Sequence, residues 1–246
     1  MKALGIDIGG SAVKGAPVDT NTGRLLAERL KIETPEKLSP ARLAATVAEI
    51  AAHFRWRGPI GVGYPGVIQG TRIRTAANLH PRFVGCDGVK LFARATGCRV
   101  ALLNDAAAAG LAEMRFGSGR GFAGKTLMLT LGTGIGSVVA LDGVVVPLEL
   151  GHLPMKGRSA ERRVSSSARK RLDLSWSQWA RRLNEYFEVL ETIIQPELII
   201  IGGGVSSKHD KFFPHLRTRA RLIPARLGNA AGIIGAALHA VPAARD

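Results

Sequence analysis

Residues 3–18 read Ala-Leu-Gly-Ile-Asp-Ile-Gly-Gly-Ser-Ala-Val-Lys-Gly-Ala-Pro-Val, which is an apolar run, a glycine turn and a second apolar run. This pattern predicts a β-hairpin. Residues 24–33 follow as a third predicted strand, and 40–54 as a helix that Ser39 caps. The order of strand, glycine turn and strand returns at 126–146. We therefore expect two copies of one α/β topology.

Apolar runs and their flanking turn residues predict the remaining elements. The predicted strands are 59–64, 72–75, 100–103 and 198–201, and the predicted helices are 90–96, 106–114, 176–194 and 228–239. Their order indicates a small lobe at 1–104 and a large lobe at 105–246, with a final helix, 228–240, that packs back on the small lobe. The apolar face of helix 176–194 fits a dimer interface or burial in the large lobe equally well.

Composition excludes several classes of protein. Hydrophobic residues make up 46% of the 246 residues, which excludes wholesale disorder. No uninterrupted apolar stretch approaches the roughly 20 residues that a membrane span needs, and the N-terminus lacks a signal-peptide pattern. The two cysteines, Cys86 and Cys98, exclude a disulfide scaffold and a multi-cysteine zinc site. A cytoplasmic protein with no membrane partner is expected.

The net charge of +15 is concentrated in two stretches. Residues 156–182 hold nine basic and two acidic side chains, and residues 208–226 hold six basic and one acidic. Such clustering fits a polyanion partner, or else a solvated basic face that aids solubility. The candidate positions for a polyanion track are Arg158, Arg162, Arg163, Arg169, Lys170, Arg171, Lys208, Lys211, Arg217, Arg219 and Arg221.

Three glycine-rich turns follow apolar strands, at residues 9–11, 132–136 and 202–204. Glycines let the backbone approach a phosphate group closely and offer it N–H donors. A single cluster is more often a tight hairpin turn, but three clusters at strand ends favour a phosphate-bearing ligand in a cleft between the lobes. None of the three matches the nucleotide-binding patterns GxxxxGK[ST] or GxGxxG.

Several polar residues adjoin these turns. Asp7 lies inside an apolar strand, where it either orients a hydrated Mg²⁺ or caps the turn, and Lys14 either reaches the same phosphates or points to solvent. Asp105 follows a buried strand, and spacing leaves open whether it is a helix N-cap or a base in phosphoryl transfer. Glu149 and His152 could both bind sugar hydroxyls. His152 has no cysteine partners nearby, so no zinc site is expected.

The motifs Leu4-Gly-Ile-Asp-Ile-Gly-Gly-Ser11, Leu103-Asn-Asp-Ala106, Leu131-Gly-Thr-Gly-Ile-Gly136, Glu149-Leu-Gly-His152 and 198–205 occur in this order. As a set they resemble the ROK family of sugar kinases and related repressors. The resemblance implies an α/β, two-lobed actin-like ATPase (ribonuclease H-like) fold with an interlobe active-site cleft. Further features, including Asn78, Glu161 and residues 196–206, resemble the polyphosphate-using glucokinases within that family.

The resemblance also implies roles for individual residues. Asp105 corresponds to the catalytic base that deprotonates the 6-hydroxyl of the sugar, and Asp7 to the residue near Mg²⁺, which it holds through water. The implied sugar-binding residues are Asn78, Asn104, Asp105, Glu149, His152 and Glu161. The implied phosphate-binding residues are Asp7, Gly9, Gly10, Ser11, Lys14, Gly132, Thr133, Gly134, Gly136, Gly202, Gly203 and Gly204.

The resulting hypothesis is a cytoplasmic, homodimeric kinase that phosphorylates glucose from inorganic polyphosphate, or also from ATP, with Mg²⁺. The main alternative is a strictly ATP-dependent hexose or amino-sugar kinase with an incidentally basic surface. A sugar-sensing or polyanion-binding protein without catalysis is a further alternative. A repressor of this family would carry a helix-turn-helix before the first phosphate motif, and only six residues precede Asp7. The aromatic content of 5% gives little basis for stacking on nucleic acid bases.

Overall fold

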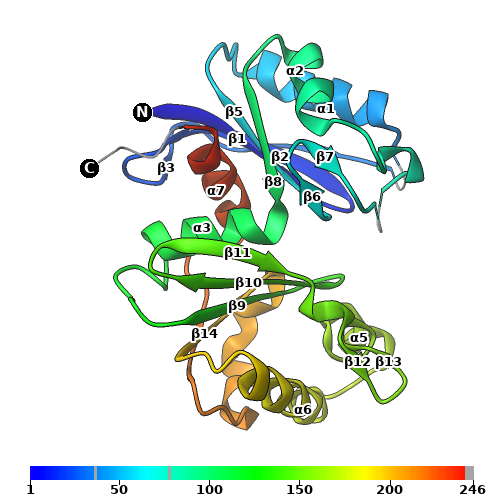
Figure 1. Cartoon of the computed structure of the whole chain (residues 1–246), viewed down its shortest axis with the longest axis vertical. Helices are drawn as coiled ribbons and strands as arrows, with labels where there is room; N and C mark the ends of the chain where they lie inside the picture. The colour runs from blue at the N-terminus through cyan, green and yellow to red at the C-terminus, as the bar shows by residue number, and fades with distance from the viewer. Residues whose placement is uncertain (36–37, 77–78, 242–246) are drawn as a thin grey trace. The chain divides into compact units, whose positions relative to one another are not determined.

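The structure is a computed structural model that describes residues 1–35, 38–76 and 79–241. The chain divides into two compact units (Figure 1): Met1–Ala112 with Ala230–Asp246, and Glu113–Asn229. The division falls inside helix α3 (Asp105–Phe116), whereas the sequence predicts it at residue 104. The first turns of α3 contact α7 (Ala231–Ala240) and therefore belong to the first unit. The final helix accordingly belongs to the first unit.

The first unit contains a six-stranded mixed sheet with the strand order β3-β2-β1-β5-β8, in which β4 also pairs with β2. Its strands are β1 (Lys2–Ile8), β2 (Ala12–Asp19), β3 (Arg24–Leu25), β4 (Leu30–Glu33), β5 (Ile60–Tyr64) and β8 (Val100–Asn104). β1 and β2 form the predicted hairpin, and β1, β5 and β8 run parallel. The strand expected at 24–33 is interrupted and forms two short strands, β3 and β4, that both pair with β2.

Two helices, α1 (Pro40–His53) and α2 (Gly88–Thr96), contact each other beside this sheet. Ser39 caps α1 as predicted, since its side chain accepts a hydrogen bond from the N–H of Arg42. Leu4 and Ile6 of β1 point into the core that these helices share. The unit also holds the short pair β6 (Ile68–Gln69) and β7 (Arg72–Ile73), and the 3-10 turn η1 (Pro81–Phe83).

Helix α7 lies against β1 and β5, and the contact is made backbone to backbone. A Cβ atom on Gly5 would overlap the carbonyl oxygen of Ile233, and one on Gly61 would overlap that of Ala236. A Cβ atom on Gly235 would likewise overlap the carbonyl oxygen of Ala108 in α3. Because successive side chains of a strand point to opposite faces, the residues of β1 on either side of Ile6 face α7.

The second unit repeats the topology of the first, as the sequence predicts. Its sheet has the order β11-β10-β9-β14-β15, with β9, β10 and β11 antiparallel and β9, β14 and β15 parallel. The strands are β9 (Thr126–Leu131), β10 (Ile135–Leu141), β11 (Val144–Leu148), β14 (Leu198–Gly202) and β15 (Arg221–Pro224). β15 was not predicted from the sequence.

Helix α6 (Trp176–Ile193) covers this second sheet, and Ser175 begins it with a capping box. Trp179, Leu183, Tyr186 and Leu190 are fully buried in the core of the unit, so burial accounts for the apolar face of α6. The shorter elements are η2 (Leu150–His152), β12 (Pro154–Met155), β13 (Arg158–Ser159), α4 (Ala160–Val164), α5 (Ser166–Arg171), η3 (Gly204–Lys211), η4 (Phe213–His215) and η5 (Gly228–Ala230). Within the described ranges, no helix is long and apolar enough to cross a membrane.

Replacing Gly61 with alanine is expected to destabilise the protein severely, because the new methyl group would overlap the backbone of α7, which a change of rotamer cannot relieve. We expect a loss of about 3 kcal/mol or more in the free energy of unfolding, measured by urea denaturation. Gly10→Ala is the control, since a Cβ atom there meets nothing within 4 Å. Equal stability of the two variants would contradict this description of the packing.

Candidate active site

The turn between β1 and β2 leaves its backbone open to a ligand. The N–H of Gly9 donates to the carbonyl oxygen of Ala12 at 2.9 Å, which closes the turn. Gly10 and Ser11 are exposed. An N–H group at such a turn can donate to a phosphate oxygen, so the geometry is compatible with the predicted phosphate contact.

Asp7 lies on the face of β1 that meets α7. A Cβ atom on Gly232 would come within 2.7 Å of the Asp7 carboxyl carbon, so a glycine leaves room for this side chain. Burial raises the pKa of Asp7, and the positive charge of Lys14, its register partner on β2, partly opposes that shift. Gly232 was missed by the sequence analysis, because a glycine within a small-residue helix gives no local signal of a distant carboxylate.

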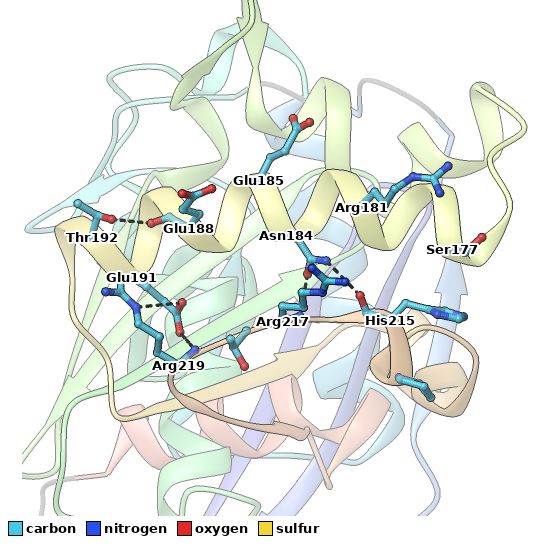
Figure 2. A pocket seen from close by; sticks show the side chains of 12 residues that line it. Ser177, Arg181, Asn184, Glu185, Glu188, Glu191, Thr192, His215, Arg217 and Arg219 are labelled. Atoms are coloured by element: carbon cyan, nitrogen blue, oxygen red, sulfur yellow. Dashed lines mark hydrogen bonds and ion pairs between the residues drawn. The ribbon is translucent and has the colours of Figure 1, made fainter.

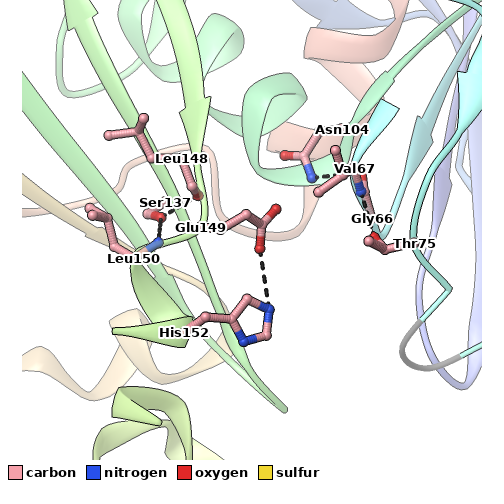
Figure 3. A network of polar contacts seen from close by, with 9 residues as sticks. All are labelled: Gly66, Val67, Thr75, Asn104, Ser137, Leu148, Glu149, Leu150 and His152. Atoms are coloured by element: carbon pink, nitrogen blue, oxygen red, sulfur yellow. Dashed lines mark hydrogen bonds and ion pairs between the residues drawn. The ribbon is translucent and has the colours of Figure 1, made fainter. Parts of the chain in front are cut away.

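The end of β8 shows which residue caps α3. Asn104 caps α3, since its Oδ1 accepts from the N–H of Ala107 at 3.0 Å. Its Nδ2 donates to the carbonyl oxygen of Gly66 at 3.2 Å (Figure 3). Asp105 becomes the first residue of the helix, and its Oδ1 accepts from the N–H of Ala106 at 2.8 Å. The capping role therefore belongs to Asn104, and Asp105 is the first residue of α3; its role as a base stays a prediction.

The loop after β5 is held by its own network. The N–H of Val67 donates to Oγ1 of Thr75 at 2.8 Å, and the hydroxyl of buried Tyr64 donates to the carbonyl oxygen of Thr75 at 3.4 Å. These bonds fix the segment beside Gly66, which Asn104 contacts. Asn78, predicted to bind sugar, lies outside the described residues.

The second and third glycine turns are neighbours in the second unit. The N–H of Gly132 donates to the carbonyl oxygen of Gly134 at 3.0 Å, which tightens the turn between β9 and β10. Gly203 has a φ of 82°, and a Cβ atom on it would lie 2.7 Å from the carbonyl oxygen of Leu131. The residues predicted to bind phosphate at 132–136 and 202–204 are thus brought together.

Helices α4 and α5 begin beside the turn at 132–136. The N–H of Ser167 donates to the carbonyl oxygen of Gly132 at 3.1 Å. A Cβ atom on Gly134 would lie 2.8 Å from Oε2 of Glu161, so this carboxylate lies against the turn. Glu161, predicted to bind sugar, is therefore adjacent to residues predicted to bind phosphate.

Glu149 and His152 lie together after β11, with Nε2 of His152 3.5 Å from Oε2 of Glu149 and both side chains substantially exposed. Ser137, which the sequence analysis missed, anchors this segment. Its buried hydroxyl donates to the carbonyl oxygen of Leu148 at 2.6 Å and accepts from the N–H of Leu150 at 3.1 Å (Figure 3). The two predicted sugar ligands thus sit on a segment fixed at both sides.

Several of the predicted polyanion residues are tied to the protein itself. Arg163 pairs with Glu185 at 3.0 Å, and Arg219 lies 3.6 Å from Glu191. The guanidinium of Arg169 stacks 4.0 Å from the ring centroid of Trp176. Arg171 also donates to a backbone carbonyl oxygen. All eleven predicted track positions lie in the described ranges. Those whose side chains make no ion pair or hydrogen bond there are Arg158, Arg162, Lys170, Lys208, Lys211, Arg217 and Arg221.

A separate hollow of about 1060 Å³ lies between α6 and residues 214–219. Figure 2 shows Asn184 at its centre, where the side chain donates to the carbonyl oxygen of His215 and accepts from the N–H of Arg217. Its walls mix both signs of charge; the acidic members are Glu185, Glu188 and Glu191, and the arginines are Arg181, Arg217 and Arg219. Carboxylates in the wall disfavour a polyanion here, so Arg217 and Arg219 are poor members of a polyanion track.

Asp7→Asn is expected to stabilise the fold at neutral pH. Because the folded-state pKa of Asp7 is raised, its charged form costs stability at a pH above that pKa, and the neutral amide removes the cost. The advantage over the native protein should shrink as the pH falls toward the ordinary carboxyl pKa. Urea denaturation at several pH values measures it. A variant less stable than the native chain at neutral pH would show that the carboxylate makes compensating interactions.

Comparisons with known proteins find relatives over most of the chain. The model of the ROK family matches residues 3–166. The polyphosphate glucokinase of Mycobacterium tuberculosis is 44% identical over 240 residues, covering 97% of this chain and 91% of the relative. The crystal structure of an inorganic polyphosphate/ATP-glucomannokinase from Arthrobacter sp. strain KM is 43% identical, with a TM-score of 0.92 and coverage of 96% and 97%.

A more distant structure supports the fold alone. The ROK family glucokinase of Streptomyces griseus, solved with glucose and AMPPNP, has a TM-score of 0.80 at 22% identity and covers 96% of this chain and 98% of its own. The duplicated topology, the ordered motifs and these similarities all indicate the same fold and family. The chain has the two-lobed actin-like ATPase fold and belongs to the ROK family.

Proposed function

We propose that this chain is a kinase that transfers the terminal phosphoryl group of inorganic polyphosphate to the 6-hydroxyl of glucose, with ATP as a second donor. The observation that carries the proposal is the likeness to a polyphosphate glucokinase over nearly the whole of both chains. The likeness to a solved polyphosphate/ATP-glucomannokinase supports it. The products are glucose 6-phosphate and a polyphosphate shortened by one unit, or ADP.

Asp105 is the general base in this proposal. Its carboxylate takes the proton of the 6-hydroxyl while that oxygen attacks the terminal phosphorus, and the bond to the leaving phosphate breaks with its electron pair. Asn104 holds the start of α3 at the loop around Gly66, which orients Asp105. Glu149 and His152 bind sugar hydroxyls from the segment that Ser137 anchors. Glu161 and Asn78 complete the proposed sugar ligands.

Phosphate binding falls to backbone N–H groups at the three glycine turns, with the side chains of Ser11, Thr133 and Lys14. These groups stabilise charge in the transition state without covalent chemistry. Mg²⁺ would be held mainly by donor phosphates and water, with Asp7 as a carboxylate partner through water. A half-buried carboxylate beside the first phosphate turn fits that role. When bound, the ion neutralises charge on the transferring group.

The exposed basic side chains supply the surface for a long donor. Arg162 and Lys170 lie on α4 and α5, which adjoin the turn at 132–136, and Arg158 lies on β13, directly before α4. Lys208 and Lys211 lie on η3, which follows the turn at 202–204. ATP has three phosphates, whereas polyphosphate extends beyond the reaction centre, so basic side chains there can bind its remaining phosphates. We include a homodimer and a cytoplasmic location in the proposal; the apolar face of α6 is buried, so another surface would form the dimer.

Asp105→Asn is expected to lower kcat by about a thousand-fold, because the amide cannot accept the proton of the 6-hydroxyl. The KM for glucose should change by less than a few-fold. Initial rates of glucose 6-phosphate formation measure both constants. Asp142→Asn is the matched control, since Asp142 lies exposed in the turn after β10 with a φ of 50°, which asparagine adopts readily. Near-normal turnover by the Asp105 variant would refute its role as base.

Neutralising exposed cations should weaken the use of polyphosphate and spare that of ATP. We expect the pairs Arg162→Gln/Lys170→Gln and Lys208→Gln/Lys211→Gln each to raise the KM for long-chain polyphosphate about ten-fold or more at low salt. Each pair should also flatten its dependence on salt, since fewer counterions are exchanged. Arg219→Gln is the control, because Arg219 is already paired with Glu191. If KM for polyphosphate does not depend on salt, the basic residues serve solubility and ATP remains the donor.

A further inference from the structure

Glu113 is a fully buried carboxylate with an unusual set of partners. Its Oε2 accepts from the N–H of Ser118 at 2.8 Å and of Arg226 at 3.2 Å, and its Oε1 accepts from the N–H of Leu227 at 2.7 Å. Within the described part of the chain, no lysine or arginine pairs with it. Three backbone donors therefore hold the charge of this carboxylate.

The surroundings are built for this contact. A Cβ atom on Gly117 would overlap Oε2 of Glu113, so only glycine at this position leaves room for the carboxylate. The N–H groups of Gly117 and Gly119 both donate to the carbonyl oxygen of Glu113 at 3.0 Å. The hydroxyl of Ser118 donates to the carbonyl oxygen of Pro224 at 2.7 Å, which ties the end of β15 to the same loop.

The position of Glu113 in the chain distinguishes it from an ordinary buried acid. The chain passes between the two units twice, at Ala112–Glu113 and at Asn229–Ala230. Glu113 is the first residue after one passage, and its partners Arg226 and Leu227 come just before the other. One carboxylate thus joins the two connections. The same helix, α3, begins with Asp105.

We propose that Glu113 is a positioning residue that binds the two connections into one joint and so sets how Asp105 is presented to the sugar ligands of the second unit. This inference rests on the proposed function for its catalytic consequence. Without this link between the two connections, the two units would move more freely. The base, the hydroxyl and the phosphate would then be aligned for reaction in a smaller fraction of the bound complexes.

Glu191 provides a matched control. It is also a buried carboxylate of the second unit and accepts from the N–H groups of Arg219 and Ala220 at 2.7 and 2.8 Å, but it lies at neither passage. Glutamine at either position keeps the size and turns one acceptor oxygen into a donor. At position 113 that donor faces a backbone N–H group, because both oxygens of Glu113 accept such bonds, whereas at position 191 both backbone bonds can stay on Oε1 and the donor faces the side chain of Arg219. Both variants should lose stability. A merely structural role for Glu113 predicts no other difference between them.

The test compares Glu113→Gln and Glu191→Gln with the native protein under conditions in which all are folded. We expect Glu113→Gln to lower kcat at least ten-fold with ATP or polyphosphate, while the Kd for glucose, measured by calorimetry, changes less than three-fold. Glu191→Gln should keep kcat within two-fold. Without any ligand, small-angle scattering should give a larger radius of gyration for Glu113→Gln alone. Equal kcat losses in the two variants, or scattering unchanged by Glu113→Gln, would overturn the proposal.

Ser118→Ala is a second test variant, for the case that Glu113→Gln fails to fold. It removes the bond to Pro224 and leaves the carboxylate in place, so it should shift kcat and the radius of gyration in the same direction by a smaller amount. No shift in either quantity would count against the joint. Absence of sugar phosphorylation by the native protein would refute the proposed function, whereas the scattering comparison tests the joint without any activity.

Discussion

The backbone contact between α7 and the strands β1 and β5 is the constraint on which the first unit depends. Glycines on both partners remove the side-chain layer that normally separates a helix from a sheet. One result is that α7 fixes the positions of two neighbouring segments. The first turn of α7 meets Asp7, while Gly235 in its middle meets the helix that begins with Asp105. The two acids assigned to phosphate binding and proton transfer are therefore located by a single element.

The second unit relies instead on buried polar side chains that bind backbone groups of other segments. Ser137 fixes the segment of Glu149, Glu191 fixes the start of β15, and Glu113 fixes the loops at 118 and 226–227. Breaking such a bond costs more than a neutral surface change, since the partner remains buried and unsatisfied. The exposed ligands Glu149 and His152 owe their placement to these contacts rather than to partners of their own.

Local patterns in the sequence predicted much of this fold. The hairpin at β1 and β2, the caps Ser39 and Ser175, and the duplicated strand order all follow from neighbouring residues. Helices α4 and α5 were not predicted, because their basic composition hides the apolar period. The contacts of Gly5 with α7 and of Glu161 with Gly134 join segments far apart in the chain, which no local pattern encodes. Spacing likewise left open whether Asp105 caps α3, and the bond from the N–H of Ala107 to Asn104 gives that role to Asn104, while the base role of Asp105 stays a prediction.

The place of α7 in the chain has a consequence for synthesis. The second unit is one continuous segment, so all of its strands can emerge from the ribosome and pair while the C-terminal residues are still being added. The first unit begins earlier but cannot finish, because the surface of β1 and β5 that receives α7 stays uncovered until the last helix is made. The first unit of this enzyme thus cannot complete its core until the second unit has been synthesised in full.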